Sequence, residues 1–137
     1  MSSATNALEE SIGNHLLRTS TWAKPAGIYV ALFTTLPAED GTDGVEVSGG
    51  NYARVQNGPS DAAWNAPVGG NGEFSNASAI VFGSPNANWG NVIGAGIYDA
   101  STGGILLARA SLDTARNIVA GDPAPNFPAG ALKFILA

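Results

Sequence analysis

The stretch that decides the fold is IYVALF, residues 28–33, because every position in it is apolar. In an extended chain, successive side chains point to opposite faces. The two faces would carry Ile28, Val30 and Leu32 on one side and Tyr29, Ala31 and Phe33 on the other. A strand with two apolar faces must be covered on both sides, so we expect a central strand here.

Short strand patterns continue outward from this segment toward the C-terminus. The stronger candidates are Tyr52–Gln56, Ser78–Phe82, Val92–Tyr98, Ile105–Ala110 and Ala131–Leu136, and the weaker ones are Glu73–Ser75 and Asn117–Val119. We expect Leu36–Asn51 to be a long surface loop, in which Val45–Val47 could form a short strand. Glycine, proline and asparagine separate nearly all of the strand candidates, with no helical pattern between. We therefore expect an all-β fold, a mainly antiparallel β-sandwich or jelly-roll-like barrel, with one short N-terminal α-helix.

Glycines mark two local features around the strand at Val92–Tyr98. The segment from Tyr98 to Gly104 is typical of a hairpin, in which Asp99 bonds the following backbone and the glycines accept positive φ. Gly94 and Gly96 resemble a dinucleotide-binding loop, but no helix pattern follows them. They instead predict the close approach of another backbone or of a large ring, such as tryptophan.

Helical periodicity occurs only at the start of the chain. Asn6 and Glu9 have the spacing of a capping box, which predicts a helix from about Ala7 to Arg18. Its apolar stripe consists of Leu8, Ile12 and Leu16. About three turns are marginal alone, so the stripe should dock on the chain's own sheet or on a neighbour. We expect a helical arm at residues 1–23 and one β-sandwich domain at residues 24–137.

Composition excludes several classes of protein. The 137 residues suit one domain, and 45% hydrophobic against 12% charged residues argues against disorder. A net charge of −5 argues against nucleic acid binding, and the absence of cysteine excludes disulfides and thiolate chemistry. No apolar run is long enough for a membrane helix, and residues 1–20 do not resemble a secretory signal.

Few residues could perform chemistry. His15 is the only histidine, and it borders the apolar stripe of the expected helix, so we assign it to the docking surface rather than to catalysis. The sequence predicts no catalytic residue, no cofactor and no metal ligand set, and hence no enzyme. A hydrolase ranks third among the functions that we consider, because one histidine and scattered carboxylates do not supply a convergent site.

An acidic loop and three tryptophans are the remaining candidates. The acids are Glu39, Asp40, Asp43 and Glu46, four in eight residues. They could hold a divalent ion or meet a basic partner, but we favour a solvated loop whose Asp-Gly pairs form turns, because the EF-hand pattern is absent. Trp22, Trp64 and Trp89 lie in or beside expected loops, where they could bind sugars, anchor a protein contact or cap the sandwich ends.

Several separated segments resemble small tailed-bacteriophage virion proteins, usually labelled tail-fibre-like or minor structural proteins. The most specific segments are Leu32-Phe33-Thr34, Gly50-Asn51-Tyr52-Ala53-Arg54, Trp89-Gly90, Gly96-Ile97-Tyr98-Asp99 and Ala120-Gly121-Asp122. The similarity extends from about Leu8 to Leu136, nearly the whole chain. The resemblance implies a non-enzymatic, β-rich building block of a phage particle, assembled in the host cytoplasm and located in the virion.

Within the virion, we expect a capsid cement or decoration protein that binds the major capsid protein. The chain lacks the repeats and heptads of long fibres, but a small tail or tail-fibre component, with tail protein partners and a carbohydrate-binding receptor role, is the alternative. We expect a homo-oligomer, with a trimer as the first hypothesis, and neither nucleic acid nor membrane as a partner. The expected docking residues are Leu8, Ile12 and Leu16, together with Trp22, Trp64 and Trp89.

Overall fold

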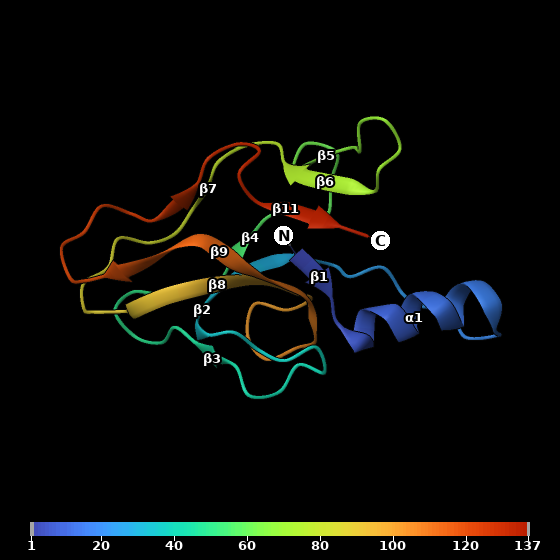
Figure 1. Cartoon of the computed structure of the whole chain (residues 1–137), viewed down its shortest axis with the longest axis horizontal. Helices are drawn as coiled ribbons and strands as arrows, with labels where there is room; N and C mark the ends of the chain where they lie inside the picture. Colours follow the sequence, from blue (N-terminus) through green and yellow to red (C-terminus); the bar gives the residue numbers. More distant parts are fainter. Residues whose placement is uncertain (1, 137) are drawn as a thin grey trace.

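A computed structural model of the chain describes residues 2–136, which form three antiparallel sheets and one helix (Figure 1). The main sheet has the order β1-β9-β8-β2-β3, and β4 also pairs with β2. Its strands are β1 (Ser2–Ala4), β2 (Tyr29–Thr35), β3 (Val45–Glu46), β4 (Val55–Gln56), β8 (Gly90–Tyr98) and β9 (Leu106–Ile118). The smaller sheets consist of β5 (Trp64–Asn65), β6 (Glu73–Asn76) and β11 (Lys133–Ile135), and of β7 (Ile80–Val81) and β10 (Asn126–Phe127). The expected all-β class with one short N-terminal helix is confirmed.

The expected central strand is confirmed as β2. It pairs with β8 along one edge and with β3 and β4 along the other. All four residues from Val30 to Phe33 are buried, so both faces of the strand are covered. The apolar side chains that predicted the strand are therefore the centre of the fold.

The two faces of β2 contribute to different clusters of buried side chains. Val30 and Leu32 pack with Ile80 and Phe82, which come from β7 and the residue after it. Ala31 and Phe33 pack on the opposite face with Leu106. Figure 1 shows β7 and the β5-β6-β11 sheet on the same side of the main sheet, where they form a second layer.

The helix α1 (Asn6–Leu17) begins one residue earlier than expected, and its N-cap is Thr5 rather than Asn6. The Thr5 hydroxyl accepts a hydrogen bond from the Leu8 amide at 3.4 Å and donates to the Leu106 carbonyl at 2.6 Å. Thr5 can do both because β1 ends directly before it and holds it against β9. The helix then projects away from the sheets (Figure 1).

Strand β1 was not expected, because Ser2-Ser3-Ala4 has no apolar alternation. It forms through backbone pairing with residues 108–110 of β9, which requires no particular side chain. The same applies to the middle of β9. The expected strands Ile105–Ala110 and Asn117–Val119 merge into one 13-residue strand, Leu106–Ile118, which leaves out Ile105 and Val119 and includes the residues between the two. The N-terminal segment is thus an edge of the main sheet as well as a helix.

The expected hairpin between β8 and β9 is confirmed. Asp99 accepts a hydrogen bond from the Ile105 amide at 2.7 Å, and Gly103 and Gly104 have φ values of 61° and 74°. The expected close approach at Gly96 is also present, but the ring is Phe33 rather than a tryptophan. A Cβ on Gly96 would lie 2.6 Å from Cε2 of Phe33.

Candidate binding groove

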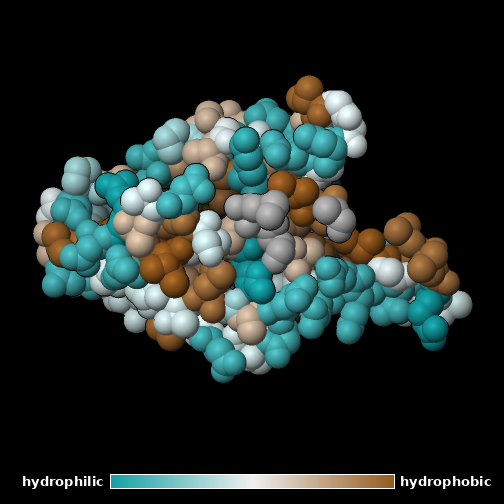
Figure 2. Space-filling model, viewed as in Figure 1, coloured by the Kyte–Doolittle hydropathy of each residue, from teal (hydrophilic) through white to brown (hydrophobic). Residues whose placement is uncertain are grey.

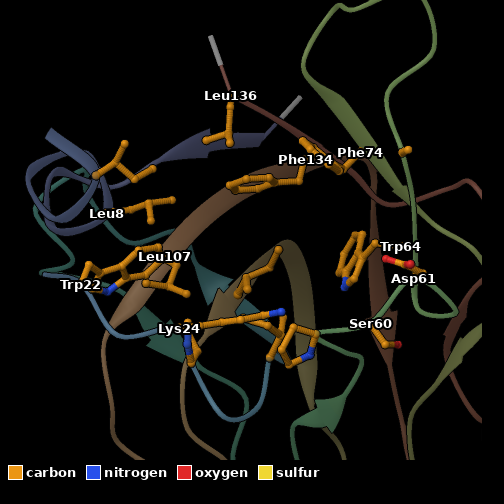
Figure 3. Close-up of a pocket in the computed structure, with 16 residues that line it drawn as sticks. Leu8, Trp22, Lys24, Ser60, Asp61, Trp64, Phe74, Leu107, Phe134 and Leu136 are labelled. Carbon is orange, nitrogen blue, oxygen red and sulfur yellow. The ribbon is translucent and has the colours of Figure 1, made fainter. Parts of the chain in front are cut away.

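An apolar groove of about 510 Å³ lies between α1, the main sheet and the β5-β6-β11 sheet (Figure 3). Leu8 and Ile12 of α1 form one wall, and Trp64 and Phe74 form part of the opposite wall. Leu107 of β9 lies at its floor, where it packs against Leu8. Concave apolar sites of this size are typical of binding sites.

The groove brings together four of the six expected docking residues. Leu8, Ile12, Trp22 and Trp64 line it, although they are spread over 57 positions of the chain. Leu8 is buried against the chain's own sheet, and Ile12, Trp22 and Trp64 are half-buried. Part of the helical stripe therefore docks within the chain.

The other two expected docking residues lie elsewhere. Leu16 stays 71% exposed near the end of α1 and does not reach the groove. Trp89 is only 5% exposed, because it is inside the main cluster of buried residues and donates to the Gly50 carbonyl at 2.7 Å. Its ring therefore offers little surface to a partner.

The sequence did not identify the C-terminal side of the groove. Phe134 and Leu136 come from β11 and the residue after it, and Phe74 comes from the partner strand β6. Both segments were expected as strands, and their aromatic positions were the available signal. Nothing in the local pattern indicates that these strands face the N-terminal helix.

The groove has a sparse polar rim formed by Lys24, Ser60 and Asp61. The indole nitrogen of Trp64 donates to the Asn57 carbonyl at 2.8 Å, so the polar edge of this ring is already satisfied. What the groove offers a ligand is mainly hydrophobic surface with a few charges at its edge. This arrangement suits the binding of apolar side chains.

His15 has a structural contact. Its Nδ1 accepts a hydrogen bond from the Trp22 amide at 3.2 Å. This bond ties the segment after the helix back onto α1 and so positions Trp22 beside Leu8. Among residues 2–136, no group of three or more His, Cys, Asp or Glu side chains is placed to hold a metal ion.

The acidic loop divides into separate local contacts. Glu46 binds Arg54 and accepts a hydrogen bond from the Tyr52 hydroxyl at 2.7 Å. Asp40 accepts from the side chain and the backbone of Thr42, and these hydrogen bonds hold the pKa of Asp40 below its usual value. The Thr42 hydroxyl also lies 3.4 Å from a carboxylate oxygen of Asp43, so three of the four acids contact groups of their own chain.

Arg54 is the centre of a nearly buried network that joins β3, the start of β4 and the β8–β9 hairpin. It makes a two-pronged ion pair with Glu46, with N–O distances of 2.9 and 2.8 Å, and its side chain is 8% exposed. It also donates to the carbonyls of Ala100 and Gly103 in the β8–β9 hairpin. Burial acts to lower the pKa of Arg54, but the hydrogen bonds and charge of Glu46 outweigh it and raise the pKa.

The tyrosines of this network are held protonated. Burial is the main cause that raises the pKa of Tyr52, whose hydroxyl also accepts from the Leu32 amide at 3.0 Å. Burial likewise raises the pKa of Tyr98, against the opposing effect of the nearby Arg54 charge. Together these contacts hold β3, β4 and the β8–β9 hairpin against the central strand.

Four of the five segments that carry the family resemblance contact one another in the fold, Ala120-Gly121-Asp122 being the exception. Gly50 accepts from Trp89, and Tyr52 makes an edge-to-face contact with the same tryptophan at 5.4 Å between ring centroids. Arg54 contacts Tyr98, and the turn at Gly121 donates to the Pro85 carbonyl. These segments build the scaffold, and of their residues Ile97 also lines the groove.

Comparison with known proteins gives one family. The family described as "Podophage GP4 fiber I protein gp80" matches residues 3–135, nearly the whole chain. No curated protein matches the chain. The resemblance to small tail-fibre-like virion proteins is thereby confirmed. No helix among residues 2–136 is both long and apolar enough to cross a membrane.

Proposed function

Because the chain belongs to the family of the podophage GP4 fiber I protein gp80, we propose that it is a non-enzymatic subunit of a virion fibre. The family supports a virion structural role, a place in the virion, and association with tail or capsid proteins. The match over residues 3–135 is the observation that carries the proposal. The fibre position follows from the name of the family.

The groove supports a role in joining proteins. Its walls combine Trp22, Trp64 and Phe134 with aliphatic side chains, and aromatic anchors of this kind concentrate the binding energy of protein contacts. A contact that is weak for one subunit becomes durable when many copies are linked, because each further contact forms at high effective concentration. A passive subunit would hold its neighbours in this way.

A capsid cement or decoration role is the second candidate. The low charge content of 12% and the absence of fibre-type repeats and heptads favour a compact shell subunit. Under this alternative the chain would bind the major capsid protein, and virions without it would have fragile shells. Under the fibre proposal, loss of the chain would leave the shell intact and would change the tail.

Location and copy number in purified virions test the proposal. An antibody raised against the purified chain should label the tail region in negatively stained particles, and quantitative gel staining should give a few dozen copies or fewer. Label over the whole head with hundreds of copies would instead establish the capsid role. Particles lacking the gene product provide the control for antibody specificity.

Two further measurements test the enzymatic and the receptor alternatives. Purified chain should show no turnover in a broad hydrolase screen, and sustained turnover would contradict the non-enzymatic role. A Trp64→Ala variant reports on the receptor alternative, because Trp64 is half-buried in the groove wall. Loss of adsorption together with measurable glycan affinity of the parent chain would favour a carbohydrate receptor.

A further inference from the structure

We propose that the end of helix α1 of one copy inserts into the apolar groove of a second copy and closes a homo-oligomer. The inserted segment is Leu16-Leu17-Arg18, which we call the helix tip. This inference rests on the proposed function only in assigning the groove to protein contact. It is tested on the purified chain, so that it and the virion location can fail separately.

The helix tip is an apolar surface that is exposed to solvent. Leu16 and Leu17 are 71% and 86% exposed, although they are adjacent leucines at the end of an ordered helix. Figure 2 shows hydrophobic surface over the outer part of α1, where the helix projects from the body. Two large exposed side chains side by side are typical of a contact surface when a complementary groove exists.

The same chain cannot fill its own groove with this tip. Leu16 follows Leu8 by eight residues, which places it about 12 Å farther along the helix axis. Leu8 is fixed in the groove wall against Leu107, so the rigid helix carries the tip away from the groove. A second copy is therefore needed to bring the two surfaces together.

Charges favour this occupant. Arg18 follows the two leucines at the tip. The groove rim holds one charge of each sign, Lys24 toward Trp22 and Asp61 beside Trp64 (Figure 3). The Asp61 side is therefore the one that attracts Arg18. Arg18 and Asp61 are both exposed, and neither forms an ion pair with another of residues 2–136. When the leucines enter the apolar groove, the Arg18 guanidinium reaches the edge where Asp61 lies, and the opposite charges attract. Such rim charges set specificity and register.

When the helix tip of one copy enters the groove of another, every groove is filled only if the copies form a closed assembly. Reciprocal insertion closes a dimer, and insertion in one direction around a ring closes a trimer. In both assemblies each chain donates one tip and accepts another. The tip and the groove should therefore be equally necessary for association.

Cysteine cross-linking tests the contact directly, because the chain contains no cysteine. Ala66 lines the groove and is exposed, as is Leu16 at the tip. A mixture of the Leu16→Cys and Ala66→Cys chains should give a disulfide-linked pair on mild oxidation. The matched control pairs Leu16→Cys with Val81→Cys, since Val81 is 54% exposed and belongs to β7, a strand that lies away from α1 (Figure 1). Equal yields from both mixtures would overturn the proposal.

Solution mass gives the second test. The wild-type chain at tens of micromolar should have the mass of a closed oligomer by light scattering, and Leu16→Ser with Leu17→Ser should reduce it to a monomer. Asp61→Arg and Arg18→Asp should each weaken association at least tenfold, and their combination should restore it. Circular dichroism checks that each variant is folded. A monomeric wild type, or an oligomer unaffected by the two serines, would refute the insertion.

Discussion

The guanidinium carbon of Arg54 lies 3.5 Å from the centroid of the Tyr98 ring, while the same group binds both carboxylate oxygens of Glu46. Arg54 precedes β4, Glu46 ends β3, and Tyr98 ends β8. One side chain thus ties three elements of the main sheet together. The planar guanidinium is suited to this, because it can stack on a ring and donate in several directions at once.

Replacing Arg54 with lysine should lower the free energy of unfolding by about 1–3 kcal/mol, because an ammonium cannot keep the paired and stacked geometry. Urea denaturation followed by fluorescence measures the change. Lys133→Met is the matched control, since Lys133 pairs with Glu73 at 3.6 Å but its side chain is 54% exposed. It should change the free energy by less than about 1 kcal/mol. Equal losses in the two variants would contradict the role of Arg54.

Gly96→Ala should destabilise the fold by about 1–3 kcal/mol, because the new methyl group would meet Phe33 and Leu106 in a packed site. Gly13→Ala is the control, since a Cβ there has no atom within 4 Å. Gly13 lies inside α1, where alanine should add up to about 1 kcal/mol of stability. Thermal denaturation of both variants should show shifts of opposite sign. A neutral Gly96→Ala would argue against the close packing.

Alkaline pH should destabilise the folded chain. An unfolded tyrosine loses its proton near pH 10, whereas burial raises the pKa of Tyr52 and Tyr98 in the fold. Above that pH the unfolded state binds fewer protons than the folded state, so the free energy of unfolding falls as the pH rises. The stabilisation is fully present below about pH 10. Denaturation midpoints between pH 8 and 11.5, with tyrosinate absorbance recorded in parallel, measure it.

Tyr52→Phe provides the control for this pH dependence. The variant should be less stable than the parent at pH 8, because it loses the hydrogen bonds to Glu46 and from the Leu32 amide. Its stability should then fall less steeply above pH 10, because one raised pKa has been removed. A slope identical to that of the parent would show that Tyr52 does not contribute.

Thr5→Val should cost about 1–3 kcal/mol, because it removes the helix cap and leaves the buried Leu106 carbonyl with one partner fewer. Thr5→Ser keeps the hydroxyl and should lose less than half as much. Hydrogen exchange at the Leu8 amide should speed up in the valine variant and change little in the serine variant. Similar exchange rates in both would assign the effect of Thr5 to packing alone.

The N-terminal region shows what the local sequence pattern can and cannot predict. Leu8 and Ile12 pack on the chain's own sheet, whereas Leu16 has the same spacing and remains exposed. Spacing defines a face of the helix but not where the sheet beneath it ends. The packed part of the stripe ends at Ile12, so Leu16 lies beyond the surface that the sheet offers. Whether residues 1–23 act as a separate arm stays a prediction.

The sequence by itself determined the local structure wherever side chains repeat with the period of an element. IYVALF specified a strand covered on both faces, Asp99 with the glycines after it specified the hairpin, and the N-terminal stripe specified a helix. Each of these features depends either on contacts between residues close together in the chain or on the side chains of a single element. The all-β class followed from the same information.

Only the tertiary structure decided where the groove lies. It joins Leu8, Trp22, Trp64 and Phe134, which belong to four separate segments. It also decided that Ser2-Ser3-Ala4 is a strand, because backbone pairing with β9 requires a partner edge rather than an apolar pattern. Periodicity records which side chains share a face, whereas the choice of the faces that meet depends on the packing of the whole chain.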